Sequence, residues 1–124
     1  MHNKIKILLV EDSEEICNLL QFVFETKGFD VDSARDGVEA TNKPLEEFDA
    51  IILDLQMPNM DGKQFLHVLR EEKNLSIPVI MFTSHERDGL EDELLEAGAQ
   101  KVIIKPAKAE VLIKAVSDCL APKK

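Results

Sequence analysis

The stretch AIILDLQMPNMDG, residues 50–62, joins a short apolar run to a polar loop and decides the class of fold. Residues 50–53 form a continuous apolar run, which is typical of a strand covered on both faces of a parallel sheet. Asp54 follows directly, so a carboxylate lies where the buried strand ends. Pro58 and the pair Asp61-Gly62 have the turn chemistry that ends a strand and starts a helix. The stretch therefore predicts a buried strand that presents Asp54 at its carboxyl end.

Four further segments have the length and composition of strands. Continuous apolar runs at Lys4 to Val10 and Val79 to Phe82 predict buried strands like the first. Phe29 to Ala34 and Lys101 to Ile104 are less apolar, and we expect them at the two edges of the sheet.

Segments with the helical period lie between these strands. Apolar residues spaced three and four apart predict four helices, around residues 16–24, 65–69, 90–95 and 112–120. A fifth helix near Val38 to Phe48 is predicted to be short, kinked or broken, because Pro44 removes a backbone donor in its middle. Five strands alternating with five helices indicate an α/β fold, a doubly wound five-stranded parallel sheet of (βα)5 order with helices on both faces.

Length and composition indicate one domain, residues 1–124, with a short C-terminal tail at 121–124. The net charge of -9 argues against direct nucleic-acid binding, which depends on neutralising phosphates with Lys and Arg. No apolar stretch approaches the roughly 20 residues of a membrane span, so we expect no membrane insertion and a cytoplasmic location. Cys17 and Cys119 are expected to be small core residues in a reducing compartment.

Polar side chains follow the predicted strands. Glu11 and Asp12 come after the first strand, Asp54 after the third, Thr83 after the fourth and Lys105 after the fifth. In the flavodoxin-like strand order 2-1-3-4-5, ligands bind beyond the carboxyl ends of the strands where the order reverses. That point lies between the first and third strands, so we expect the three carboxylates to converge there.

Three carboxylates in one cleft repel one another unless a proton or a cation intervenes. Oxygen ligands without His or Cys suit a hard ion, and Mg²⁺ characteristically takes one or two carboxylates with waters and a phosphate oxygen. A carboxylate beside a metal, a Lys and a Thr hydroxyl is also the equipment for covalent phosphoryl transfer, with Asp54 as the nucleophile.

Simpler interpretations of the same residues remain open. Asp12 with Glu15 three residues later has the pattern of a helix capping box, and this role is compatible with a place in the cleft. Thr83 could satisfy local backbone groups only, and Lys105-Pro106 could be a solvated turn. Asp54 could be a plain carboxylate at the end of a strand.

Four motifs stand in order along the chain: LLVEDS (8–13), ILDLQMPNMDG (52–62), Thr83-Ser84, and Ala97-Gly98-Ala99 leading to Lys105-Pro106. In these motifs, and over essentially all 124 residues, the chain resembles the receiver domain of two-component response regulators, most closely the stand-alone chemotaxis type. The resemblance implies that Asp54 is the phosphoacceptor and that Mg²⁺ is held by Glu11, Asp12, Asp54 and the backbone carbonyl of Gln56. It also implies that Thr83 and Lys105 bind the phosphoryl group.

By the same resemblance, the phosphodonor is a phosphohistidine on a sensor histidine kinase or a histidine phosphotransfer protein, and the signal passes to an unidentified protein target. Such a chain catalyses its own phosphorylation and dephosphorylation without being an ordinary turnover enzyme. Gln56 and His85 occupy the two positions that flank the approach of water, so we expect them to set the lifetime of the phosphoryl group.

Two positions depart from the family pattern. Val102 stands where many receivers carry a Tyr or Phe that swings inward on activation, and Ala107 stands where an aromatic residue is common. These departures support an alternative function as a phosphorylation-independent interaction module. An aspartyl-phosphate phosphatase would need a second Asp at Gln56, and a flavin carrier would need a phosphate-binding loop where the acidic Glu11 to Glu15 stands.

Overall fold

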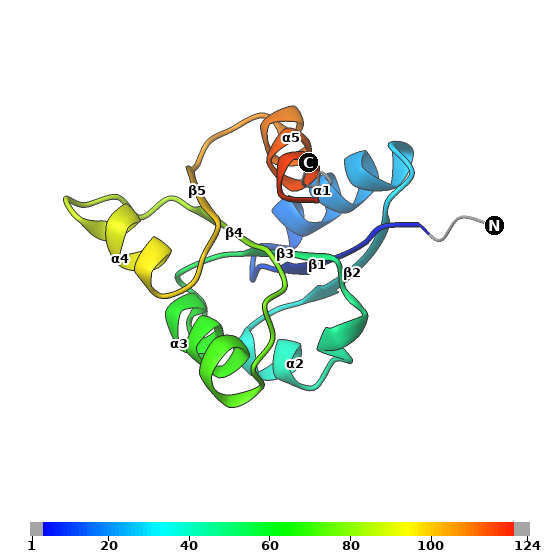
Figure 1. Ribbon diagram of the computed structural model, residues 1–124. Helices are drawn as coiled ribbons and strands as arrows, with labels where there is room; N and C mark the ends of the chain where they lie inside the picture. The colour runs from blue at the N-terminus through cyan, green and yellow to red at the C-terminus, as the bar shows by residue number, and fades with distance from the viewer. Residues whose placement is uncertain (1–3, 121–124) are drawn as a thin grey trace.

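A computed structural model of the chain describes residues 4–120, and the predicted tail at 121–124 lies outside the described residues. Five parallel strands form one sheet in the order β2-β1-β3-β4-β5 (Figure 1). The strands are β1 (Lys6–Val10), β2 (Asp30–Ala34), β3 (Ala50–Leu53), β4 (Val79–Thr83) and β5 (Lys101–Ile104). The predicted order and the two predicted edge strands are confirmed.

Some predicted strand ends are wrong by one or two residues. The first strand begins at Lys6 rather than Lys4, because its pairing with β2 starts with Lys6 opposite Asp30. The fourth strand extends one residue further than predicted, since Thr83 pairs with Ile104 and closes β4 instead of following it. An apolar run marks where side chains are buried, whereas the ladder of hydrogen bonds marks where the strand ends.

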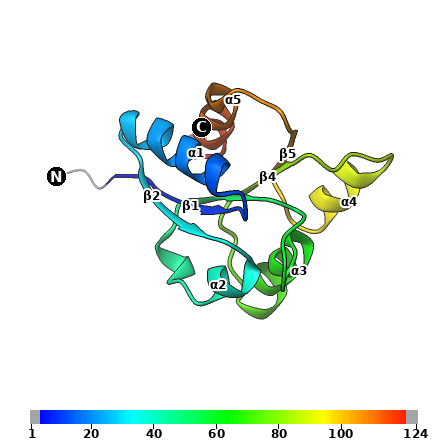
Figure 2. The same cartoon turned by 180° about the vertical axis from the view of Figure 1, so that it is seen from behind.

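The helices cover both faces of the sheet. They are α1 (Glu14–Thr26), α2 (Gly37–Thr41), α3 (Gly62–His67), α4 (Leu90–Glu96) and α5 (Ala109–Leu120). Figures 1 and 2 show α1 and α5 on one face and α2, α3 and α4 on the other. A 3₁₀ helix at Leu45–Glu47 and a π-helical turn at Val68–Glu72 complete the set. None of the helices within residues 4–120 has both the length and the apolar character needed to cross a membrane.

Alternate side chains of the central strands enter two separate cores. Ile7 and Leu9 of β1 pack with α1 and α5, whereas Leu8 and Val10 pack on the side of α2, α3 and α4. Because both sets are fully buried, the strand has no polar face, which explains the continuous apolar runs in the sequence. Cys17 and Cys119 are free thiols that pack, half-buried, at the rim of the core under α1 and α5.

The second helix is broken, as predicted. Helix α2 ends at Thr41, and the chain continues through Pro44 into the 3₁₀ helix. Leu45 and Phe48 are nevertheless buried, so the segment keeps its apolar contacts with the sheet without a continuous helix.

The start of α1 differs from the capping box suggested by Asp12 and Glu15. Ser13 is the N-cap, and its hydroxyl accepts a hydrogen bond of 3.3 Å from the backbone N–H of Ile16. Asp12 therefore lies one residue before the cap and is exposed. The serine hydroxyl satisfies an orphan donor of the first turn, which leaves the Asp12 carboxylate free of that task.

Candidate functional site

The register of the sheet places the carboxylates side by side. Val10 of β1 pairs with Leu53 of β3, so the residues that follow them, Glu11 and Asp54, emerge level with each other. The backbone N–H of Asp54 donates to the Val10 carbonyl at 3.0 Å, which holds the two strand ends together. One carboxyl oxygen from each of Glu11, Asp12 and Asp54 lies within 4.8 Å of the other two. The three carboxylates predicted to converge therefore do so.

Burial makes this cluster costly to keep charged. Glu11 and Asp54 are each only 6% exposed, whereas Asp12 is exposed. Burial raises the pKa of the Glu11 carboxyl above its ordinary value of 4.5, and the Asp54 charge adds to the rise. The hydrogen bond from Lys105 offsets only part of this effect. The site therefore favours any cation that neutralises the carboxylates.

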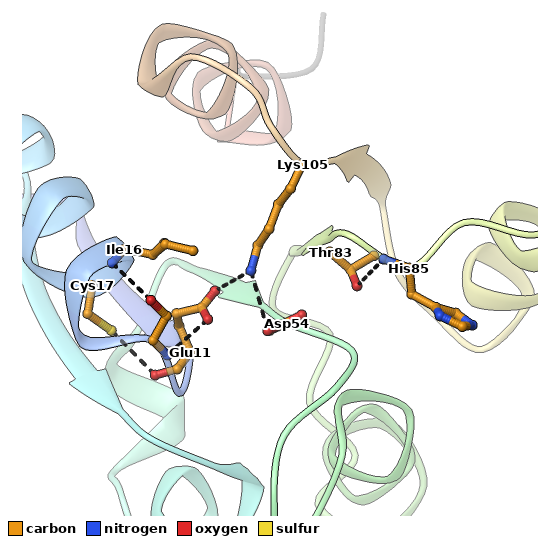
Figure 3. Close-up of polar contacts among 8 residues, drawn as sticks. Glu11, Ile16, Cys17, Asp54, Thr83, His85 and Lys105 are labelled. Atoms are coloured by element: carbon orange, nitrogen blue, oxygen red, sulfur yellow. Dashed lines mark hydrogen bonds and ion pairs between the residues drawn. The ribbon is translucent and has the colours of Figure 1, made fainter.

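Lys105 brings a positive charge to the cluster from the far edge of the sheet. Its Nζ donates to Glu11 Oε1 at 2.9 Å and lies 3.4 Å from Asp54 Oδ2 (Figure 3). Burial lowers the pKa of Lys105, but the hydrogen bond to Glu11 and the charges of Asp54 and Glu11 outweigh it. The pKa therefore lies above its ordinary value of 10.5. Lys105 accordingly remains an ammonium group at neutral pH and is not free in a solvated turn.

Thr83 is buried at the end of β4, where its Oγ1 accepts a hydrogen bond of 3.1 Å from the backbone N–H of His85. The local backbone role considered from the sequence is therefore present. A hydroxyl has two lone pairs and one hydrogen, so this contact leaves the Thr83 hydrogen available as a donor to a ligand. The backbone N–H of Lys105 donates to the Thr83 carbonyl at 2.8 Å, which fixes the two residues relative to each other.

Gln56 and His85, the two residues expected to flank the approach of water, touch each other. Gln56 Nε2 lies 3.3 Å from His85 Nδ1, so an amide of the loop after β3 meets an imidazole of the loop after β4. Figure 3 shows the His85 ring pointing away from Asp54. The sequence identified both positions, but their direct contact depends on the paths of two loops.

Three constraints shape the loop that follows Asp54. A Cβ on Gly62 would lie 2.2 Å from the Asp54 carbonyl oxygen, so this position requires glycine. Asn59 adopts φ 68°, a conformation that Asn tolerates better than most residues, and its side-chain amide donates to Asp36 at 2.7 Å. Asp61 and Gln64 form a complete capping box at the start of α3. These contacts fix the loop that carries the Gln56 carbonyl.

Sequence reasoning missed two residues next to the site. Asp36, the N-cap of α2, binds the Asn59 side chain and so connects α2 to the loop after Asp54. Phe82 lies beneath Lys105, with the ammonium 5.3 Å from the centre of its ring. Both contacts join residues that are distant in sequence, so no local pattern indicates them.

Val102 is partly buried on β5 and lines a cavity of about 300 Å³. The other walls come from Ile104 and from the 86–92 segment at the start of α4. The smaller side chain at position 102 therefore faces open space between β5 and α4.

The chemistry of the donor set fits a hard divalent cation. Glu11, Asp12 and Asp54 supply three carboxylates without a soft ligand, and Lys105 supplies one positive charge on the side of β5. The site can therefore hold a cation, and Asp54 beside Lys105 and Thr83 can attack an electrophile that carries oxygen atoms.

Comparisons with known proteins agree with this geometry. The sequence model of the response regulator receiver domain matches residues 7–117. The chain is 40% identical over 102 residues to the alkaline phosphatase synthesis transcriptional regulatory protein PhoP of Bacillus subtilis (strain 168), a match that covers 82% of this chain and 42% of PhoP. It is 38% identical over 105 residues to the transcriptional regulatory protein ResD of the same organism, covering 84% of this chain and 43% of ResD.

Among solved structures, the chemotaxis protein CheY4 of Vibrio cholerae superposes with a TM-score of 0.87 and 31% sequence identity. The superposition covers 95% of this chain and 100% of CheY4. The match to PhoP and ResD, in contrast, spans less than half the length of each, so their whole-protein activities are not transferred to this chain. The family match over 111 residues and the shared fold identify the chain as a member of the receiver domain family of two-component response regulators.

Proposed function

We propose that residues 1–124 act as a single receiver domain that takes a phosphoryl group from a phosphohistidine donor onto Asp54. The observation that carries the proposal is the position of Lys105, whose ammonium lies between Glu11 and Asp54 at the edge of the carboxylate cluster. A lysine with a purely structural role would need only one carboxylate as its partner. This site instead holds three carboxylates around one ammonium group, which leaves negative charge for a cation to neutralise.

Mg²⁺ is the cation that we propose for the site, with Glu11, Asp12, Asp54 and the Gln56 carbonyl as its protein ligands. When bound, it would neutralise charge on the carboxylates and on the incoming phosphoryl oxygens. The Lys105 ammonium would neutralise negative charge on another oxygen of the phosphoryl group, and Thr83 would donate its hydroxyl hydrogen to a phosphoryl oxygen.

In the proposed reaction, a carboxylate oxygen of Asp54 attacks phosphorus in line with the bond to the donor's imidazole nitrogen. The new O–P bond forms as the N–P bond breaks, and the electron pair of the N–P bond stays on the imidazole nitrogen. The product is an aspartyl phosphate. The donor would belong to a sensor histidine kinase or a histidine phosphotransfer protein, and the signal would pass to a protein target through altered binding.

Loss of the phosphoryl group requires water to reach phosphorus from the side opposite Asp54. We propose that the contact between Gln56 and His85 controls this approach. Substitution of either residue by Ala is therefore expected to change the decay rate of the phosphorylated protein, and an unchanged rate in both variants would remove these residues from the mechanism.

A phosphorylation-independent interaction module is the second candidate, and Val102 supports it. A Val side chain has no ring to reorient, so a phosphoryl group at Asp54 would need another element to bias two states of the protein. For the phosphorylated protein, we propose that this element is the loop from Thr83 into α4, because Thr83 is a proposed ligand of the phosphoryl group and accepts a hydrogen bond from the His85 backbone.

The deciding experiment exposes the protein to acetyl phosphate with Mg²⁺ and follows its intact mass. We expect the parent protein to gain one phosphoryl group, and the Asp54→Asn variant and a sample with a chelator to gain none. If the Asp54→Asn variant also gained a phosphoryl group, the phosphorylated residue would not be Asp54. If the parent protein bound Mg²⁺ but gained no phosphoryl group, the phosphorylation-independent interaction module would be favoured.

A further inference from the structure

Lys105 must cross a neighbouring strand to reach the carboxylates. It follows β5 at the edge of the sheet, whereas Glu11 and Asp54 follow β1 and β3. Strand β4 lies between them in the sheet. The Lys105 side chain therefore passes over the end of β4, and the aromatic ring at that end is Phe82.

Phe82 is placed to hold the ammonium group. The Lys105 Nζ lies 5.3 Å from the centre of the Phe82 ring, within the range of a cation–π interaction. Phe82 is itself only 5% exposed and packs with the core under α1 and α5, so its ring has little freedom to move. The Lys105 side chain is 15% exposed, and partial desolvation strengthens the attraction to the ring.

The ring differs in kind from the other two groups that hold Lys105. Glu11 and Asp54 are carboxylates, and the proposed function assigns their oxygens to a cation and to phosphorus. A neutral ring has no oxygen to give to either, so its hold on Lys105 does not compete with metal binding or phosphorylation. A lysine side chain without such a support is flexible, and ordering it when a ligand binds costs conformational entropy.

We propose that Phe82 is a positioning residue: its ring holds the Lys105 ammonium over the ends of β3 and β4 and thereby sets the affinity of the site for a phosphoryl group. The inference rests on the proposed function, because it concerns the same lysine. It adds a residue whose side chain has no group that can bind a metal ion or phosphorus and that acts only through Lys105.

The chain provides a matched control. Lys6 Nζ lies 5.5 Å from the centre of the Phe48 ring and also pairs with Glu47 at 3.1 Å. Phe48 is 4% exposed, so Phe48→Leu removes a buried ring beneath a lysine just as Phe82→Leu does. Both substitutions remove a buried ring of the same size, but only the ring of Phe82 lies beneath the lysine that contacts Glu11 and Asp54.

The test measures binding of beryllofluoride, an analogue of the phosphoryl group, by calorimetry at saturating Mg²⁺. Phe82→Leu should weaken binding about three- to tenfold, because the unsupported Lys105 side chain must then lose conformational freedom when the ligand binds. Phe82→Tyr, which keeps the ring, should restore most of the affinity, and Phe48→Leu should bind like the parent protein. In a Lys105→Met background, Phe82→Leu should cause no further loss.

Two results would overturn the inference. The first is that Phe82→Leu binds beryllofluoride as tightly as Phe48→Leu does. The second is that Phe82→Leu lowers the affinity for beryllofluoride as much in the Lys105→Met background as in the parent protein. A parent protein that fails to bind beryllofluoride would instead contradict the proposed function, so the two failures are distinguishable. Thermal unfolding of each variant, without ligand, identifies any loss that comes from the core alone.

Discussion

Lys105 carries one positive charge into a cleft that holds three carboxylates. Its contacts with Glu11 and Asp54 are both shielded from solvent, so they are stronger than ion pairs on the surface. The same lysine contacts Asp54, the proposed phosphoacceptor, so one side chain serves both the stability of the metal-free protein and the proposed chemistry. Its removal should therefore lower the stability of the metal-free protein and, in the proposed chemistry, also weaken binding of the phosphoryl group.

Lys105→Met is expected to destabilise the metal-free protein by about 2 kcal/mol, because two buried carboxylates lose their cation. Mg²⁺ should then raise the melting temperature more in the variant than in the parent, since the metal supplies the missing charge. Thermal unfolding with Mg²⁺ and with a chelator measures both effects. Lys114→Met is the control, because the ion pair of Lys114 with Asp118 is exposed and worth little. An equal response to Mg²⁺ in variant and parent would show that Lys105 and the metal do not share the site.

At the level of the elements, Arg70 connects three segments at the end of the sheet opposite the carboxylates. It lies in the π-helical turn after α3, and its guanidinium donates to the carbonyls of Leu75, Ile77 and Gly98 at 2.8 Å each. Gln100 accepts from Arg70 and also from the backbone N–H of Val79. One side chain thereby fixes the starts of β4 and β5, which sets the register that delivers Thr83 and Lys105 to the site.

Arg70→Lys should lower the free energy of unfolding by about 2 kcal/mol, although the charge is kept. A lysine has no planar fork, so it cannot reach all three carbonyls at once, and some of them lose their donor. Urea unfolding measures the loss. Arg35→Lys, at an exposed position, is the matched control and should unfold like the parent. If both variants behaved alike, the carbonyls around Arg70 would have to be satisfied by water.

At the scale of the whole molecule, α3 and α4 are joined by a network around Glu93. The Glu93 carboxylate accepts from Lys63 of α3 and from Arg87 of the loop before α4, the latter at 2.8 Å. The hydrogen bonds from Arg87 and Lys63 lower the pKa of Glu93 from 4.5 to about 2. Arg87 lies four residues after Thr83, so this network holds the loop that links the proposed phosphorylation site to α4.

A lowered carboxyl pKa makes the contribution of Glu93 to stability dependent on pH. Above 4.5 the carboxylate is charged in both the folded and the unfolded protein, and the full contribution is present. As the pH falls toward about 2, protonation in the unfolded protein removes that contribution. Glu93→Gln should therefore lower the urea midpoint at neutral pH, and the difference from the parent should shrink on acidification.

Glu91→Gln removes the same charge from the same helix and serves as the control for net charge. Because the Glu93 side chain is about one third exposed to solvent, the effect should be small and should weaken in high salt. A difference between parent and Glu93→Gln that stayed constant with pH would mean that Glu93 acts through packing rather than through its charge.

Several features of the fold and the site are predictable because they depend on local patterns. The five strands and five helices follow from the two periods of apolar residues, and the break near Pro44 follows from a missing donor. The polar residues at the strand ends follow from the rule that parallel strands deliver their carboxyl ends to one edge. The roles of Glu11, Asp12, Gln56, Asp54, Thr83 and Lys105 remain predictions, although the structure brings the side chains of Glu11, Asp12, Asp54 and Lys105 together.

Other features depend on contacts between distant segments. Ser13 rather than Asp12 caps α1, because the geometry of the turn after β1 decides which side chain reaches Ile16. The contact of Gln56 with His85 and the support of Lys105 by Phe82 join loops and strands that are far apart in sequence. The sequence by itself thus determined the order of the elements and the polar residues at their ends, since these depend on neighbours along the chain. Only the tertiary structure decided which side chains meet, because that depends on strand register and on the backbone path of each loop.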